Sequence, residues 1–315
     1  MKILRLAAAA VVLFAACEIG VRLFAPMDAL IYQDSADPLL GFELKPGARG
    51  EKVGAEVEIS AQGLRDDLVP ESKPSGESRV VVVGGHEAFG LGLARDAGFV
   101  ARLPEGLGQV RGVNLSMYSY ALGQKVELAC RRAAEFKPDI VVLQASEGDA
   151  IEPPAATLPL PALKNNLRAR SAFVRWVLER RYRRRTQDVA AAAPAKAASD
   201  NEPQEAENQL KRLKDCLAAS GSKLVVAFVP GVDDAGGGPQ SGLRRGLESG
   251  AKKIGATFVD AGPALRRVPA GRRALKPGLP FLSPAAQNAL AGELRKRLAP
   301  LLPRPKKAPS RRPSV

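Results

Sequence analysis

Residues 79–85 read Arg-Val-Val-Val-Val-Gly-Gly, and this stretch decides the fold. A half-buried strand would alternate apolar and polar residues, so four consecutive valines predict a strand that is buried on both faces. The two glycines end that strand. Strands buried on both faces are typical of parallel sheets that are covered by helices on either side.

The same rhythm of strand and helix continues along the chain. Further strands are expected at residues 110–115, 139–144, 223–229 and 256–260, with helices at 94–107, 125–136, 210–219, 243–254 and 284–298. This alternation predicts a flavodoxin-like α/β fold, a three-layer sandwich around a five-stranded parallel sheet. Ligands of such sheets bind beyond the carboxyl ends of the strands. Functional residues are therefore expected after Val83, Leu115, Gln144 and Val229.

The amino-terminal residues predict a membrane segment. Lys2 and Arg5 precede an apolar run from Leu6 to Cys17, and Glu18 and Arg22 are spaced to pair on one helix face. We expect an uncleaved anchor in the inner membrane of a bacterial envelope, with the rest of the chain on the periplasmic side; lipidation at Cys17 after cleavage is the alternative. The expected division is residues 1–27 anchor or signal, 28–78 extended lead-in, 79–300 α/β domain and 301–315 basic disordered tail.

Positive charge is concentrated in an insertion at residues 161–209. The chain has a net charge of +14, but no nucleic-acid-binding motif accompanies it, so nucleic acid is not expected as a partner. Residues 161–185 predict a helix that carries Trp176, and residues 186–208 lack periodicity and predict disorder. Envelope polysaccharide or an anionic membrane surface is the expected partner of Arg180, Arg181, Arg183, Arg184 and Arg185, and a solvated helix end is the alternative.

The remaining residue types favour neither a metal nor a cofactor. With one histidine and three scattered cysteines, the sequence offers no transition-metal site. Gly85–Gly90 has P-loop spacing but lacks the Lys-Ser/Thr pair that would hold phosphate and magnesium, so no nucleotide cofactor is expected. Cys130 and Cys216 both fall in helical patterns, where buried thiols are expected; one disulfide is the alternative, because export would expose both to an oxidising space.

Several segments, in order, resemble the SGNH (GDSL-type) hydrolase superfamily in its subgroup with an amino-terminal membrane segment. The resemblance is good from Asp37 to Asp149 and thin from Leu210 to Leu298. It is carried by Asp37–Gly47, Gly63–Arg65, Val80–Gly84, Phe89–Gly92, Gly98–Leu103, Asn114–Leu115 and Lys137–Leu143.

The resemblance implies an esterase chemistry whose residues this chain has replaced. Such enzymes use a serine nucleophile, a histidine base oriented by an aspartate, and an oxyanion hole made by a glycine N–H and an asparagine. No catalytic residue is intact: the family's positions fall on His86 for the nucleophile, Ser116 and Gly148 for the oxyanion hole, and Gly278 and Phe281 for the final aspartate and histidine. His86 is the one histidine of the chain, so none can serve as base from the carboxyl-terminal half.

These replacements lead to three functional hypotheses. The first is a pseudoenzyme that binds a glycan, an acyl-bearing ligand or a partner protein at the envelope. The second is an active esterase or O-acyl transferase with a non-standard site around His86, Ser116 and Asp149. The third is an adaptor whose basic helix and tail dock on an anionic membrane or polymer. The expected ligand-binding residues are Gly85, His86, Glu87, Asn114, Ser116, Glu147 and Asp149.

Overall fold

The computed structural model describes residues 2–25, 30–146, 149, 170–177, 201–232, 241–279 and 281–303. Within these ranges five strands form one sheet in the order β6-β5-β7-β8-β9, and every neighbouring pair is parallel. This 2-1-3-4-5 order is the flavodoxin-like one, so the predicted fold class is confirmed. The strands are β5 Ser78–Val83, β6 Val110–Asn114, β7 Ile140–Ser146, β8 Lys223–Val229 and β9 Thr257–Asp260.

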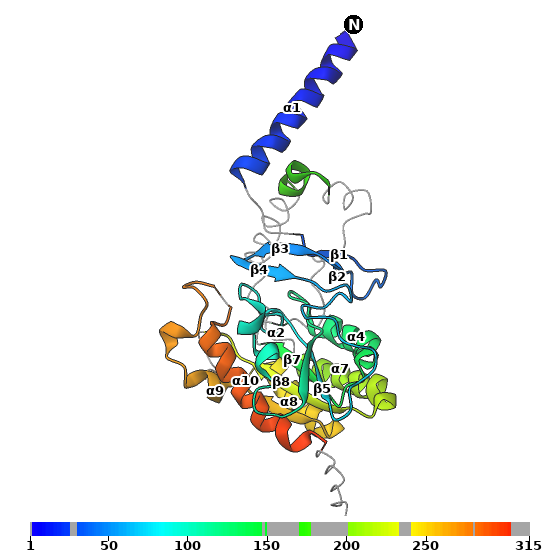
Figure 1. Ribbon diagram of the computed structural model, residues 1–315, viewed down its shortest axis with the longest axis vertical. Coiled ribbons are helices and arrows are strands. Elements are labelled where there is room, and N and C mark those ends of the chain that lie inside the picture. The colour runs from blue at the N-terminus through cyan, green and yellow to red at the C-terminus, as the bar shows by residue number, and fades with distance from the viewer. Residues whose placement is uncertain are drawn as a thin grey trace, which may run out of the picture.

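Helices cover both faces of the sheet and complete the three layers (Figure 1). One face carries α4 Leu122–Arg132, α7 Glu202–Leu217 and α8 Gly242–Ile254, and the other α3 Phe99–Arg102, α9 Gly262–Arg266 and α10 Pro284–Leu298. Val81 and Val83 pack in the first layer, whereas Val80 and Val82 pack in the second. The valine run is therefore explained by burial on both sides of β5. Short helical turns join the elements: α2 His86–Phe89, η1 Arg95–Ala97, η2 Ala133–Phe136, η4 Ala218–Ser220, η5 Ala270–Arg272 and η6 Ala299–Leu301.

Two helix predictions were wrong in their extent. The helix expected at 94–107 is only η1 and α3, because Gly98 between them has an extended backbone and Pro104 follows. The helix expected from Leu210 begins at Glu202 instead. Pro203 lies in its first turn with acidic residues around it, and buried Ala206 extends the apolar face, so these residues begin a helix where disorder was expected.

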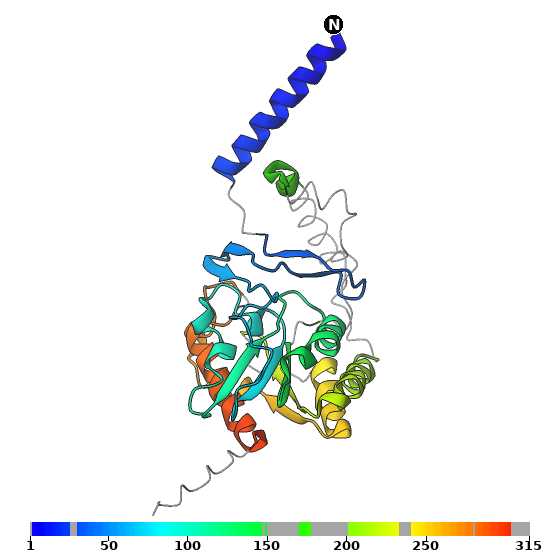
Figure 2. The same ribbon diagram turned by 45° about the vertical axis from the view of Figure 1, so that its right-hand side comes forward.

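The lead-in folds into two antiparallel hairpins, whereas an extended segment was expected. These are β1 Tyr32–Asp34 with β2 Phe42–Leu44, and β3 Arg49–Lys52 with β4 Ala55–Glu58. Gly41 and Gly54 take positive φ angles of 73° and 77° at the turns, which is why glycine stands there. The hairpins lie between α1 (Lys2–Phe24) and the rest of the domain (Figure 2).

The hairpins pack on the carboxyl edge of the sheet. Tyr120, which follows β6, contacts Phe42 with a ring separation of 5.1 Å, and Gln124 Nε2 donates to the carbonyl of Leu40 at 2.7 Å. Buried Arg65 donates to the carbonyl oxygens of Phe89, Gly90 and Leu93 and stacks on the Phe89 ring. The lead-in thus holds the loop that follows α2 in place.

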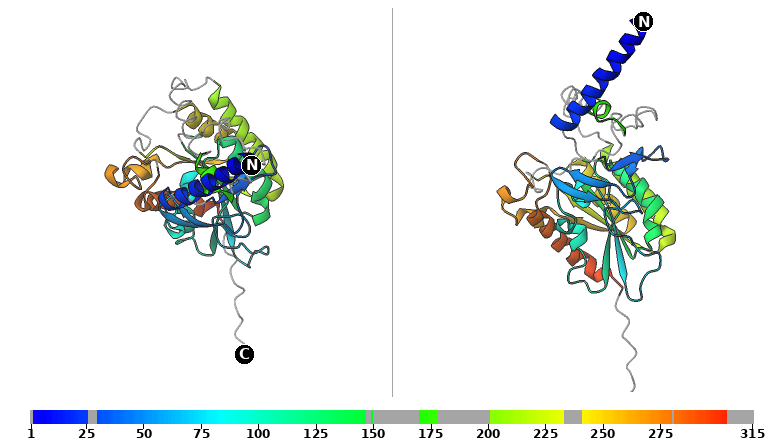
Figure 3. Two further views of the ribbon diagram at one scale, coloured as in Figure 1. Left: turned by 90° about the horizontal axis from the view of Figure 1, so that it is seen from above. Right: turned by 45° about the horizontal axis from the view of Figure 1, so that its top comes forward.

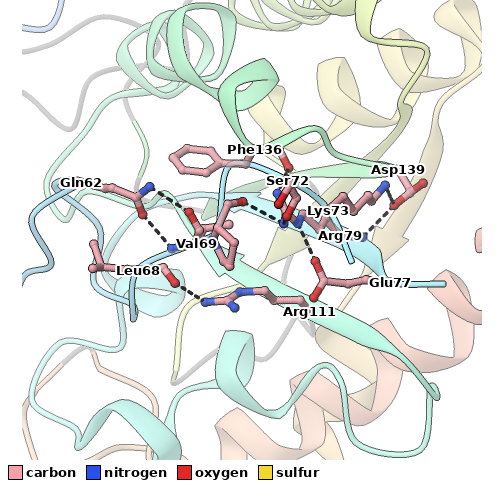
Figure 4. Close-up of polar contacts among 11 residues, drawn as sticks. Gln62, Leu68, Val69, Ser72, Lys73, Glu77, Arg79, Arg111, Phe136 and Asp139 are labelled. Carbon is pink, nitrogen blue, oxygen red and sulfur yellow. Dashed lines mark hydrogen bonds and ion pairs between the residues drawn. The ribbon is translucent and has the colours of Figure 1, made fainter. Parts of the chain in front are cut away.

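The opposite, amino edge of the sheet is closed by a fully buried arginine (Figure 4). Arg79 pairs with Glu77 at 2.6 Å and donates to the carbonyl oxygens of Pro70, Ser72 and Phe136. Asp139 accepts the Arg79 backbone N–H at 2.7 Å and pairs with Lys73. Because its donors are matched by these carbonyls and carboxylates, Arg79 ties the segment before β5 to the domain.

A disulfide joins Cys130 on α4 to Cys216 on α7, so the expectation of two buried thiols was wrong. The two helices pack side by side on one face of the sheet and bring the Cα atoms to 5.4 Å. Cys17, in α1, is a free thiol.

Helix α1 projects away from the domain (Figure 3). None of its residues is buried. It has 23 residues and a mean hydropathy of 2.0 over its most apolar window, which suffices to cross a membrane. A helix of this length and composition near the amino terminus can span a membrane or serve as a signal sequence.

Candidate functional site

The candidate site lies where the sheet reverses its strand order. β6 follows β5 in the chain and lies on one side of it, whereas β7 lies on the other side. Ligands of doubly wound sheets bind at the carboxyl ends of the strands that flank this switch point. In this chain His86 and Glu87 follow β5, and Ser146 and Asp149 end or follow β7.

Two glycines allow the turn from β5 into α2 to approach β7. A Cβ atom added at Gly84 would lie 2.4 Å from Gln144 Oε1 and 2.6 Å from the Ala88 Cβ, so a side chain has no room there. The backbone N–H of Gly85 donates to Gln144 Oε1 at 2.8 Å. This close approach places the first residue of α2, His86, at the mouth of the sheet.

His86 is paired with its chain neighbour Glu87. The imidazole Nε2 lies 3.0 Å from Glu87 Oε1. The other carboxylate oxygen, Oε2, accepts hydrogen bonds from Ser146 Oγ at 2.8 Å and Gln144 Nε2 at 3.2 Å. Both oxygens of this buried carboxylate are therefore satisfied, and Glu87 fixes the orientation of the imidazole.

A second buried pair lies beside the first. Lys125, from α4, pairs with Asp149, and the same Asp149 oxygen accepts the backbone N–H of Ser146 at 2.9 Å. Ser146 thus touches both carboxylates, one through its hydroxyl and one through its backbone. When His86 is protonated, the four charged groups balance as two cations and two anions.

The charges shift each other's pKa values. Burial raises the pKa of Glu87, but the charge and hydrogen bond of His86, with Lys125 and Ser146, outweigh it and bring that pKa to about 2. Burial lowers the pKa of His86, and the neighbouring Glu87 carboxylate outweighs this, so its pKa is raised above 6.5. Burial raises the pKa of Asp149 despite its ion pair with Lys125.

His86 is the member of this cluster that solvent reaches. Its side chain is 29% exposed, whereas those of Glu87, Lys125 and Asp149 are 6%, 0% and 9% exposed. Phe281 packs against the imidazole with the ring centroids 5.5 Å apart. Because Nε2 faces Glu87, a ligand at this site would meet Nδ1 of His86.

The structure turns two of the other expected site residues inward. Asn114 donates its side-chain N–H to the carbonyl of Ala88 at 2.8 Å, and its oxygen accepts the backbone N–H of Ser116. The buried hydroxyl of Ser116 donates to the Val82 carbonyl at 3.2 Å. Glu147 and Gly148 lie outside the described residues. Gly278 lies in an exposed turn with a φ of 76°.

Three residues of the cluster were missed by the sequence analysis: Lys125, Gln144 and Ser146. Gln144 and Ser146 interrupt the end of an otherwise apolar strand, and this polar pair could have marked the site. Lys125 gives no such signal, because a lysine near the start of an amphipathic helix is ordinarily solvent-exposed.

No family model matches the chain, and no curated protein matches it. Three solved structures illustrate what it is similar to. TesA is 19% identical, and the match covers 71% of this chain and 100% of TesA with a TM-score of 0.44. The lipase/acylhydrolase from Enterococcus faecalis is 13% identical, and the match covers 73% of this chain and 100% of that protein with a TM-score of 0.46. A member of the lipolytic G-D-S-L family from Veillonella parvula is 10% identical, and the match covers 70% of this chain and 97% of that protein with a TM-score of 0.44.

The chain is thus an α/β protein with a flavodoxin-like sheet and a polar site at its switch point. It is similar to lipolytic hydrolases of the G-D-S-L type, as the sequence motifs also indicate. What the site does depends on its own residues.

Proposed function

We propose that this protein is a membrane-tethered, extracytoplasmic pseudoenzyme whose site binds an acyl- or glycan-bearing envelope ligand and does not hydrolyse it. The observation that carries the proposal is the contact of His86 with Phe281. By the sequence resemblance these positions would hold the nucleophilic serine and the histidine base, and they are neighbours in the fold. A phenylalanine ring cannot accept a proton, so the base is missing where the nucleophile would need it.

No other described hydroxyl of the cluster replaces the nucleophile. Ser116 and Ser146 are both buried, and both hydroxyls donate to fixed acceptors, the Val82 carbonyl and the Glu87 carboxylate. A serine that attacks an ester must instead face the ligand and donate to a base. This arrangement supports binding over acyl transfer.

The partly exposed imidazole suggests which ligand atoms the site would hold. With its pKa raised by Glu87, His86 remains largely protonated in mildly acidic solution and donates a charged hydrogen bond. Carbonyl, carboxylate and hydroxyl oxygens are suitable acceptors, and all three occur in acylated glycans and acyl lipids. The Cys130–Cys216 disulfide and the apolar α1 both agree with an extracytoplasmic location.

A first prediction is that the protein does not turn over simple esters. Full-length chain in detergent, incubated with p-nitrophenyl acetate and butyrate, should release nitrophenol at the rate of the buffer, and so should a His86→Ala variant. A serine-reactive fluorophosphonate should leave the protein unlabelled. Turnover above background that disappears in His86→Ala would contradict the proposal.

The second candidate function is an acyl hydrolase or transferase with a non-standard site, and one observation favours it. His86 and buried Glu87 form a carboxylate-oriented imidazole, the arrangement of a general base. In that case water or an acceptor hydroxyl would be the nucleophile, and Nδ1 of His86 would take its proton. The ester assay distinguishes the two candidates, because only the second requires turnover that depends on His86.

A second prediction concerns pH and tests the His86–Glu87 pair itself. Because the folded-state pKa of His86 is raised, the charged pair stabilises fully below about pH 6.5, and this contribution is lost as the pH rises through the raised pKa. The contribution of Glu87, whose pKa falls from 4.5 to about 2, is present above pH 4.5 and lost as the pH falls. The difference in unfolding free energy between the unaltered protein and His86→Asn should therefore be largest between about pH 4.5 and pH 6.5. Urea unfolding across the range measures it, and a pH-independent difference would show that the imidazole is not charged in the fold.

A further inference from the structure

Helix α1 carries a carboxylate in its apolar sequence. Glu18 lies within Lys2–Phe24, and Arg22 pairs with it at 2.8 Å one turn later. A charge within a membrane-spanning helix is costly unless other groups pair with it. The contacts of Glu18 therefore indicate what lies beside the helix.

The partners of Glu18 come from the insertion, more than 150 residues away along the chain. Glu18 Oε1 accepts the backbone N–H of Ala172 at 2.9 Å. Glu18 Oε2 accepts the Ser171 hydroxyl at 2.8 Å and the backbone N–H of Phe173 at 2.9 Å. With Arg22, the carboxylate therefore has four donor residues.

These contacts complete the start of a second helix, of which residues 172–177 are described. Ser171 Oγ accepts the N–H of Val174 at 3.1 Å, which is an amino-terminal cap from its own chain. Glu18 takes two further backbone N–H groups that a first helical turn leaves without partners. An edge-on contact between the rings of Phe14 and Phe173, 5.9 Å apart, adds an apolar contact one turn along α1.

The depth of the contact follows from helix geometry. At 1.5 Å per residue, Glu18 lies about 9 Å and Phe14 about 15 Å from the end of α1 at Phe24. The hydrocarbon core of a bilayer is about 30 Å thick. If α1 spans it, the contact falls within the outer half of the bilayer or at its interface.

We propose that residues 170–177 enter the outer half of the lipid bilayer beside α1, with Glu18 as the joint between the two segments. Inside lipid, backbone N–H groups need partners because water is absent, and Glu18 supplies them. Phe173 and Trp176 are residue types that favour the membrane interface. The partner surface is the bilayer itself. The inference rests on the proposed anchoring by α1 but not on the site at His86.

Trp176 is the only tryptophan of the chain, so its fluorescence reports on this segment alone. Full-length protein is reconstituted into vesicles of neutral phosphatidylcholine, with and without acyl chains brominated at defined depths. We expect blue-shifted Trp176 emission that brominated lipid quenches. In Glu18→Ala the emission should shift to the red and quenching should weaken by about twofold or more, because the joint is lost. Removing a charge makes α1 more apolar, so its own insertion should not suffer.

Two controls make each result decisive. Glu56→Ala removes an exposed carboxylate of β4, and its Trp176 emission should be quenched as strongly as that of the unaltered protein. Carbonate washing tests membrane anchoring by α1 separately. Release of the protein by carbonate would contradict this anchoring. A retained protein with unquenched Trp176 would contradict only the proposed joint at Glu18. Equal quenching in Glu18→Ala would also overturn the joint, because the segment would then enter the bilayer without Glu18. Quenching that needs anionic lipid and vanishes in salt would overturn it as well, because charge attraction would then hold the segment.

Discussion

Lys125→Met should lower the free energy of unfolding by about 3–5 kcal/mol, because it leaves the Asp149 carboxylate buried without its cation. Lys125 is fully buried, and methionine fills a similar volume without the charge. Burial already raises the pKa of Asp149, so the loss should be smaller in mild acid, where protonation removes the unpaired charge, than at neutral pH. Urea unfolding at the two pH values measures it.

A surface lysine provides the matched control. Lys211 pairs with Asp215 one turn along α7, and its side chain is 73% exposed. Lys211→Met should cost less than about 1 kcal/mol. The double variant Lys125→Met/Asp149→Leu should recover most of the loss, because no unpaired charge remains. A Lys125→Met loss no greater than that of Lys211→Met would mean that the pair is solvated and the cluster is not a closed network.

Removal of the Cys130–Cys216 disulfide is the second large effect. The bond closes a loop with a sequence separation of 86 residues. In the chain-entropy account, a loop of this size stabilises by about 4–5 kcal/mol, and removal of native disulfides costs about 2–5 kcal/mol. Cys130→Ala/Cys216→Ala should therefore lower the unfolding free energy by an amount in this range, measured in urea without reductant.

Treatment with reductant distinguishes the effect of losing the disulfide from the effect of the alanine substitutions. Dithiothreitol should destabilise the unaltered protein to the same degree and leave the double variant unchanged. If the unaltered protein unfolds at the same urea concentration with and without reductant, the cysteines are thiols in the protein as produced.

The sheet could be predicted from the sequence because its signals are local. Val80 to Val83 are apolar on both sides of the chain, and each later strand is bounded by a turn residue or a proline. The hairpins were missed because their strands are short and mostly polar. The first hairpin is held by contacts of Tyr32 and Phe42 with Tyr118 and Tyr120, which are distant in sequence. A pattern within one segment does not record such contacts.

The candidate site could be predicted only in part, for a similar reason. His86 and Glu87 follow the strand that the valines define, so strand ends pointed to them. Asn114 and Ser116 also end or follow a strand, yet both side chains bond to the backbone around β5. Which way a polar side chain turns depends on the space that neighbouring strands leave, and that space is set by residues such as Gly84 and Gln144.

The disulfide between α4 and α7 has a further consequence for how the protein responds to proteolysis. A peptide bond cut anywhere between Cys130 and Cys216 leaves two fragments that are still one covalent molecule. The fragment with β5, β6 and most of α4 stays attached to the one with β8, β9 and α10. Clipping inside the insertion would therefore appear on a gel only after reduction, and a nicked protein could keep its sheet, and with it the mouth where His86 lies.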